Sequence, residues 1–231
     1  MKRVMGHDLI ADSLGGLFAW RAKQNPEEIG FRFADQSYSF ADMKRMVDQV
    51  RASLRRDGAQ PGDRIAAFMH NSPWLLALFL ATAMDRLVYC PINVGSRRDD
   101  LPYFIRDIEP FAVFVDDALA EVFQSAPLDG LTTRRILVGH SPASKSLTNF
   151  ECWLEMNDAP LTDAAIEPSD PLCIMYSGGT TGLPKGIVMP QFAPVAAALR
   201  FNGIARFRQR ENFFTTLQLS HAWTPLLVLP F

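Results

Sequence analysis

Short apolar runs alternate with helical segments along most of this chain, and this alternation constrains its fold more than any other feature. The runs are too short for helices and are bounded by turn-forming residues, which is typical of buried strands; they lie at 65–69, 87–92, 111–115, 136–138 and 171–175. Helical segments separate them at 73–84, 99–108 and 118–125. Strands that alternate with helices form crossover units whose strands are parallel. The sequence therefore predicts an α/β fold, a mostly parallel sheet flanked by helices.

The stretch before these strands contains signals for element ends. Helical spacing predicts a helix over 9–23, and a hairpin follows with its turn at Asp35-Gln36. Ser39 is expected to cap a second helix, because Asp42 follows three residues later in a variant of the capping box. Gly58 suits the end of that helix, since glycine tolerates the left-handed backbone needed there.

Composition and charge indicate an ordinary globular protein. The 231 residues are 48% hydrophobic and carry a net charge of −2, so electrostatics gives no case for binding nucleic acid or an anionic membrane surface. The longest apolar run, 73–84, is far shorter than the roughly 20 residues of a membrane-spanning helix, and no signal peptide is evident. Cys90, Cys152 and Cys173 form no metal-ligand pattern. We expect a cytoplasmic protein with reduced structural thiols and no protein metal site.

A glycine- and hydroxyl-rich stretch, 176–186, lies between two short apolar runs. It holds Gly178, Gly179, Gly182 and Gly186 together with Ser177, Thr180, Thr181 and Lys185. Glycines allow a loop to turn its backbone N–H groups inward around an anion. The three hydroxyl groups add donors and Lys185 adds a positive charge. The stretch therefore predicts a loop that binds a polyphosphate.

Two other interpretations fit this stretch less well. An ordinary glycine-rich hairpin requires neither the paired threonines nor the Pro-Lys-Gly ending. A Walker-type P-loop ends in Gly-Lys-Ser/Thr, whereas here Pro184 precedes Lys185 and Gly186 follows it. We therefore favour a phosphate-binding loop of a different kind over both.

The stretch closely resembles the phosphate-binding signature of the acyl-adenylate-forming enzymes, which include acyl- and aryl-CoA synthetases, luciferases and the adenylation domains of peptide synthetases. The family pattern is Tyr-Thr-Ser-Gly-Thr-Thr-Gly-x-Pro-Lys-Gly; here Ser177 replaces the first Thr and Gly178 replaces the Ser. The loss of that hydroxyl is expected to loosen phosphate contact. The resemblance implies that Ser177, Thr180, Thr181 and Lys185 contact the β- and γ-phosphates. Gly178, Gly179 and Gly182 would let the backbone approach closely.

Further segments resemble the same family. They include 60–66 and 83–93, although Met84-Asp85-Arg86 departs from the usual Lys-Ala-Gly. A strand expected at 212–217 leads to His221, which matches the histidine of the family's Pro-x-x-His segment, while Gln218 replaces the proline. The resemblance implies that His221 orients the substrate carboxylate or gates its access.

The resemblance also implies the domain organisation and the reaction. Residues 1–231 correspond to part of the large N-terminal domain: a first α/β portion (9–145), a connecting segment (146–170) and a phosphate-loop portion (171–231). The family's C-terminal mobile domain has no counterpart here. The implied function is an ATP-dependent carboxylate–CoA ligase acting through an acyl-adenylate, with ATP, Mg²⁺ and coenzyme A as cofactor and co-substrates and a small carboxylic acid as partner. We expect these residues to be inactive alone, and a homo-oligomer is compatible with the sequence.

Two alternatives stay open at this point. The first is a non-catalytic nucleotide-binding half, or one half of a split enzyme that needs a partner chain. The second is an unrelated phosphotransferase such as a kinase, which the failed Walker pattern and the absence of a recognisable catalytic base motif disfavour. His70 follows an expected strand, and an ordinary loop histidine is the simpler interpretation of it.

Overall fold

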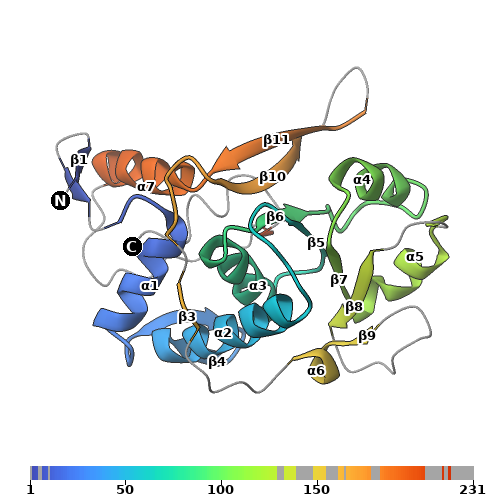
Figure 1. The fold of residues 1–231 in the computed structure, drawn as a ribbon, viewed down its shortest axis with the longest axis horizontal. Helices are drawn as coiled ribbons and strands as arrows, with labels where there is room; N and C mark the ends of the chain where they lie inside the picture. The colour runs from blue at the N-terminus through green and yellow to red at the C-terminus, as the bar shows by residue number, and fades with distance from the viewer. Residues whose placement is uncertain are drawn as a thin grey trace.

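A computed structural model of the chain describes residues 2–4, 7–9, 11–128, 133–138, 148–154, 161–163, 165–177, 183–205, 215 and 218–219. Within these residues the main feature is a seven-stranded sheet with strand order β11-β10-β6-β5-β7-β8-β9 (Figure 1). Its strands are β5 (Arg64–Phe68), β6 (Val88–Pro91), β7 (Ala112–Asp116), β8 (Arg134–Val138), β9 (Thr148–Asn149), β10 (Pro171–Ser177) and β11 (Lys185–Pro190). Every neighbouring pair is parallel except β10 and β11. The prediction of a mostly parallel sheet is confirmed.

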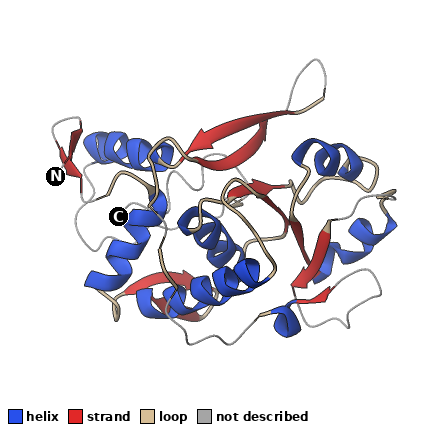
Figure 2. Ribbon diagram, viewed as in Figure 1, coloured by secondary structure: helices blue, strands red, loops and turns tan. Residues whose placement is uncertain are grey.

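Helices cover both faces of this sheet (Figure 2). One core cluster contains residues of α1 (Leu14–Gln24), α2 (Phe40–Arg56), α3 (Pro73–Met84) and α6 (Phe150–Trp153). The other contains residues of α4 (Leu101–Ile108), the 3-10 helix η1 (Asp117–Leu119) and α5 (Ala120–Ser125). The last described helix, α7 (Phe192–Ala205), contacts α1. Among the described residues, no helix has the length and apolar character that a membrane crossing requires.

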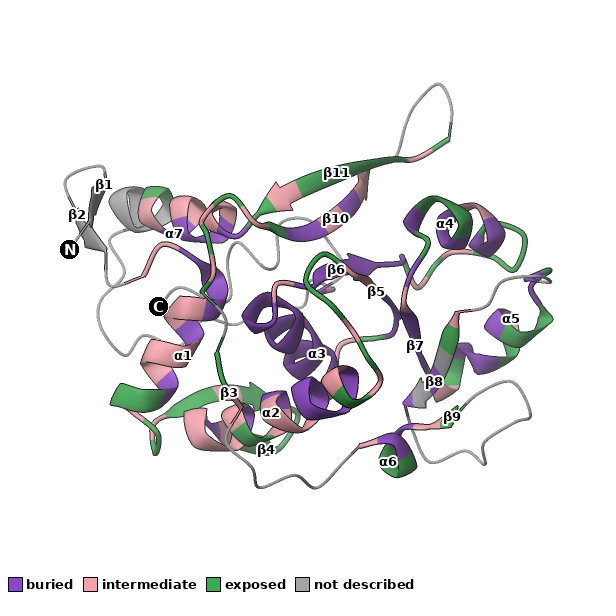
Figure 3. Cartoon of the chain, in the orientation of Figure 1, coloured by how far each residue is buried: buried purple, intermediate pink, exposed green. Residues whose placement is uncertain are grey.

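Strand β5 shows why the central strands are apolar throughout. Ile65 and Ala67 belong to the first core cluster, whereas Ala66 and Phe68 belong to the second. Successive side chains of a strand point to opposite faces, so a strand with helices on both faces buries all of them. Helix α3 is likewise buried along nearly its whole length (Figure 3), as its apolar sequence predicts.

The predicted start of α2 is confirmed. The Ser39 side chain accepts from the N–H of Asp42 over 3.1 Å, and the Asp42 carboxylate accepts from the N–H of Ser39 over 3.0 Å. The Ser39 hydroxyl also donates to Asp42 Oδ2 over 2.7 Å, and this bond, together with the one from the Ser39 N–H, holds the pKa of Asp42 below its usual range. Gly58, with φ +93°, follows the end of the helix in the left-handed region.

Substituting Ser39→Ala is expected to lower the free energy of unfolding by about 1 kcal/mol, because the first turn of α2 loses its side-chain cap. Asp42 has a depressed pKa in the folded state, so its contribution is present above the ordinary pKa of 3.8 and is lost as the pH falls through the folded value. Urea unfolding at pH 7 and pH 3 measures both effects. A deficit that does not shrink at pH 3 contradicts the contribution of the Asp42 carboxylate.

Two sequence predictions near the N-terminus were wrong in their boundaries. The helix predicted over 9–23 begins only at Leu14, because Ser13 caps it by accepting from the N–H of Gly16 over 3.2 Å. Residues 7–9 instead form β2 (His7–Leu9), which pairs with β1 (Lys2–Val4). The predicted hairpin exists as β3 (Ile29–Phe33) and β4 (Gln36–Ser39). Its turn is Ala34-Asp35, where Ala34 adopts φ +49°, and Gln36 already belongs to β4.

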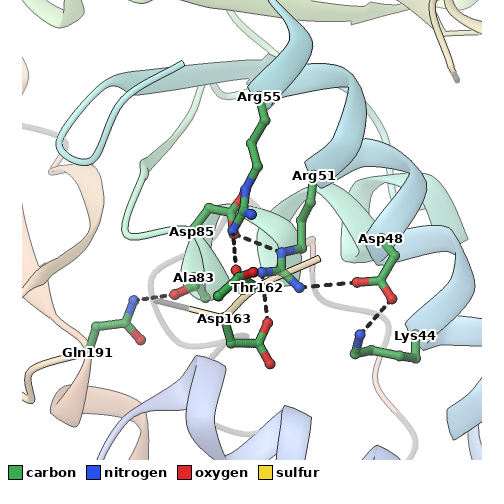
Figure 4. A network of polar contacts seen from close by, with 9 residues as sticks. All are labelled: Lys44, Asp48, Arg51, Arg55, Ala83, Asp85, Thr162, Asp163 and Gln191. Carbon is green, nitrogen blue, oxygen red and sulfur yellow. Dashed lines mark hydrogen bonds and ion pairs between the residues drawn. The ribbon is translucent and has the colours of Figure 1, made fainter. Parts of the chain in front are cut away.

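A buried ion network joins α2 to the end of α3 (Figure 4). The Asp85 carboxylate accepts hydrogen bonds from Arg51 Nε over 2.7 Å and from Arg55 Nη2 over 2.6 Å. Arg51, which is fully buried, also pairs with Asp48 at 3.1 Å and with Asp163 at 2.8 Å. Burial opposes the charged form of Arg51, but the carboxylates of Asp85 and Asp163 outweigh it and raise its pKa.

The same region explains the departure from the family pattern at Met84-Asp85-Arg86. Arg86 occupies the position of the expected glycine, and its φ of +58° lies in the left-handed region that favours glycine. The Arg86 guanidinium forms two hydrogen bonds with the Asp170 carboxylate, at 2.9 and 3.2 Å. The chain thus replaces a conformationally free residue with one that is held by an ion pair.

Candidate active site

The two described ends of the glycine-rich loop lie side by side. Ser177 is the last residue of β10 and Lys185 the first of β11, and the two are direct partners across the antiparallel pair. The Ser177 hydroxyl donates to the Lys185 carbonyl oxygen over 3.5 Å. Both residues are exposed. Gly178, Gly179, Thr180, Thr181 and Gly182 lie outside the described residues.

Strands β10 and β11 form an antiparallel hairpin. The sequence analysis disfavoured an ordinary hairpin here, and as a prediction of backbone geometry that was wrong. Six residue pairs join β10 and β11 in antiparallel register, with one irregularity near Pro171. The hairpin and the phosphate loop are nevertheless compatible interpretations. The antiparallel strands bring a hydroxyl group and an ammonium group to the same end of the unit, where an anion can contact both.

This end of the hairpin belongs to the carboxyl edge of the parallel sheet. Strands β10, β6, β5 and β7 run in the same direction, so the residues that end or follow them share that edge. In open α/β sheets this is the edge where ligands bind. The loop therefore starts at the side of the sheet that such folds use for binding.

Three more polar residues lie at this edge. His70 follows β5; its backbone N–H donates to Asp116 Oδ2 over 2.6 Å, and its Nδ1 lies 2.7 Å from the same oxygen. Asp116 also accepts from the N–H of Leu119 over 3.1 Å. These bonds join the ends of β5 and β7. They give His70 a structural role in the loop after β5. Next to it, Asn71 Oδ1 accepts from the N–H of Leu219 over 2.8 Å.

The hydrogen bond between Leu219 and Asn71 places Leu219, which lies close in sequence to the predicted site residue His221, at this edge. Leu219 is buried in the core cluster of α1, α2 and α3, two positions before His221. His221 itself, and most of the strand predicted at 212–217, lie outside the described residues. The role of His221 stays a prediction.

Sequence reasoning missed a second function for Gly186. A Cβ atom on Gly186 would lie 2.8 Å from Ile174 Cγ2 and 3.5 Å from the ring of Tyr176. Because Tyr176 is the cross-strand partner of Gly186, the missing side chain leaves room for Tyr176 and Ile174 to pack. The only signal was the glycine itself, whose position on a strand suggests a close approach.

Two cysteines of the neighbouring strands β6 and β10, Cys90 and Cys173, are buried. Burial raises the pKa of the Cys90 and Cys173 thiols to about 12 each, so both are protonated near neutral pH. All three cysteines are free, and Cys152 is exposed. Within the described ranges, no group of three His, Cys, Asp or Glu side chains has the geometry of a metal site.

A cavity of about 270 Å³ beside Arg55 and Asp85 is also lined by Gln60 and Leu87, which precede β5 and β6. It therefore lies at the opposite, amino edge.

Comparison with known proteins agrees with this geometry. Residues 18–230 match the family model described as "AMP-binding enzyme". The chain is 27% identical over 200 residues to indoleacetate–CoA ligase of Aromatoleum aromaticum, covering 85% of this chain and 38% of that protein. It is 30% identical over 207 residues to malpibaldin synthetase of Mortierella alpina, covering 88% of this chain and 3% of that protein.

A solved structure shows the same fold. Acetoacetyl-CoA synthetase from Streptomyces lividans superposes with a TM-score of 0.77 at 24% identity, covering 90% of this chain and 35% of that one. The chain belongs to the AMP-binding enzyme family, whose match spans nearly its whole length. It spans about 38% of the length of the first of these curated relatives.

Proposed function

We infer that the chain binds the polyphosphate of ATP at the end of the β10–β11 hairpin, as part of an ATP-dependent carboxylate–CoA ligase. The observation that carries this proposal is the cross-strand pair of Ser177 and Lys185 at the carboxyl edge of a sheet of this family. Relatives named as CoA ligases support the choice of coenzyme A as acceptor.

The proposed reaction has two steps. A carboxylate oxygen attacks the α-phosphorus of ATP, which breaks the bond to the β-phosphate and gives an acyl-adenylate and pyrophosphate. The thiol of coenzyme A then attacks the acyl carbon and AMP leaves. Negative charge grows on the departing pyrophosphate in the first step, and fixed donors in the site stabilise it.

The described residues fit a polyphosphate. Lys185 supplies an exposed ammonium group, and the exposed Ser177 hydroxyl lies beside the Lys185 backbone. Thr180 and Thr181 are proposed to add hydroxyl donors, and Gly178, Gly179 and Gly182 backbone N–H groups. Mg²⁺, when bound with ATP, would share the charge on the phosphates. His221 is proposed to orient the carboxylate of the acid.

Substituting Lys185→Ala is expected to weaken binding of MgATP by about 10- to 150-fold, the loss of about 1.5–3 kcal/mol from one charge-assisted hydrogen bond. Isothermal titration of the 231-residue chain with MgATP measures the change. Lys185→Arg keeps the charge and is expected to retain most of the affinity.

Lys23→Ala is the matched control, since Lys23 is an exposed lysine at the end of α1, and it is expected to bind MgATP as the unaltered chain does. Equal affinity in Lys185→Ala and Lys23→Ala overturns the assignment of Lys185. Absence of MgATP binding by the unaltered chain overturns the proposed function.

A non-catalytic nucleotide-binding half, or one half of a split enzyme, is the second candidate. The 231 residues align with 38% of the length of each of two relatives named as CoA ligases. ATP–pyrophosphate exchange with a panel of carboxylic acids tests the second candidate. Exchange by the chain alone overturns the non-catalytic half and supports the ligase. We expect the chain alone to bind MgATP without exchange, a result that follows both from part of a ligase and from a nucleotide-binding half.

A further inference from the structure

Helix α4 directs two polar side chains at the β10–β11 hairpin. Leu101, Ile105 and Ile108 are buried and fix the helix against the sheet. Tyr103 and Asp107 are four positions apart, so they share one face of the helix. Neither belongs to the set of residues buried in α4, and their polar atoms form contacts outside the core.

Each of these side chains holds one end of the phosphate loop. The Tyr103 hydroxyl donates to the carbonyl oxygen of Pro184, the residue immediately before Lys185. The Tyr176 hydroxyl, immediately before Ser177, donates to Asp107 Oδ2 over 2.5 Å. Helix α4 therefore contacts the loop at the two positions that adjoin the proposed phosphate ligands.

Packing fixes the direction of these bonds. The Tyr176 ring meets the ring of Phe104 edge to face, with centroids 4.9 Å apart and an interplanar angle of 83°. Tyr176 also lies opposite Gly186 of β11, which has no side chain to displace its ring. Burial, followed by the hydrogen bond to Asp107, raises the pKa of Tyr176, so its hydroxyl keeps its proton and remains a donor.

The two hydrogen bonds are not needed to form any single element. They join residues 81 and 69 positions apart in sequence, and Asp107 is exposed. Phe104, which is buried, already provides the packing between α4 and β10. What the two bonds add is a fixed position for the backbone on which Ser177 and Lys185 stand.

We propose that Tyr103 and Asp107 are positioning residues for the phosphate ligands, holding the backbone beside Lys185 and Ser177 so that both side chains meet one polyphosphate. This proposal rests on the proposed function. Lysine has a long flexible side chain, and its reach is useful only when the strand end that carries it is fixed. Neither residue touches the ligand itself.

The test measures affinity for inorganic tripolyphosphate and, separately, amide hydrogen exchange of the chain without ligand. Tyr103→Phe and Asp107→Ala are each expected to weaken tripolyphosphate binding by about 2- to 10-fold, the effect of one hydrogen bond. They are also expected to speed exchange of the amides at the start of β11 or the end of β10, respectively. Asp107→Asn retains an acceptor oxygen and is expected to rescue both readouts.

The decisive comparison is made in a Lys185→Ala background. If Tyr103 acts by positioning the Lys185 side chain, its hydroxyl has no effect once that side chain is removed. Tyr103→Phe is therefore expected to cause no further loss of tripolyphosphate affinity in this background. Tyr38→Phe is the matched control, because it removes a tyrosine hydroxyl that bonds Gln36 at the distant β3–β4 hairpin, and it is expected to change neither readout.

The outcomes separate the two proposals. Unchanged exchange and unchanged affinity in Tyr103→Phe and Asp107→Ala overturn the positioning roles while Lys185→Ala still supports the phosphate site. If Tyr103→Phe lowers tripolyphosphate affinity equally in the unaltered chain and in the Lys185→Ala background, the substitution damages the site in general. That result also overturns the positioning roles. If the unaltered chain does not bind tripolyphosphate, the phosphate site and the positioning roles fall together, whatever the exchange rates show.

Discussion

Substituting Asp85→Ala is expected to lower the free energy of unfolding by about 3–5 kcal/mol, the cost of removing one partner from a buried ion pair. Two guanidinium groups, those of Arg51 and Arg55, lie within 2.8 Å of the Asp85 carboxylate. Arg51 is fully buried and cannot recover this loss from water. Urea unfolding followed by circular dichroism measures the change.

Asp163→Ala is the matched control for this prediction. Asp163 also pairs with Arg51, at 2.8 Å, but its side chain is 52% exposed. Water reaches the Asp163 carboxylate, and Arg51 keeps Asp85 and Asp48 as partners, so the expected loss is smaller, about 1 kcal/mol. Similar losses at both positions would show that burial of Asp85 does not determine the cost.

Substituting Gly15→Ala is expected to lower the free energy of unfolding by about 1–3 kcal/mol, although alanine favours helices. The added Cβ would lie 2.8 Å from the backbone oxygen of Ala83 and 2.8 Å from Ile166 Cδ1. Backbone cannot move aside as the end of a flexible side chain can. Helix α1 would have to shift away from α3, and thermal and urea unfolding measure the result.

A size series distinguishes this clash from an effect on the backbone alone. Gly15→Val is expected to cost more than Gly15→Ala, because the space is closed. At Gly58, which has φ +93° and no atom within 4 Å of an added Cβ, alanine and leucine are expected to cost the same. A flat series at Gly15 would contradict the close approach of α1 to α3.

Much of the fold could be predicted because local signals agree with the tertiary structure. Ser39 with Asp42 starts α2 where the capping chemistry requires. Apolar runs such as 65–69 became strands because helices cover both faces of the sheet. The prediction failed where a single residue decides the boundary, as at Ser13 and Ala34.

The candidate site was less predictable because its supports are far apart in sequence. Composition of the 176–186 stretch indicated a phosphate loop, and the resemblance identified the family. The contacts of Tyr103 and Asp107 left no trace in that stretch, since they come from a helix some 70 to 80 positions earlier. The buried pairing of Arg51 with Asp85 was equally invisible, because each residue looks like an ordinary surface charge.

The hydrogen bonds of Gln191 can form only late in synthesis, because both partners lie far earlier in the chain. Its buried amide donates to the carbonyl of Ala83 over 2.9 Å and accepts from the N–H of Gly15, residues 108 and 176 positions earlier. A ribosome adds about 5–20 residues per second, so Ala83 waits roughly 5 to 20 s for this partner. During that interval the Ala83 carbonyl and the Gly15 N–H, which the folded protein buries against Gln191, must find hydrogen bonds elsewhere.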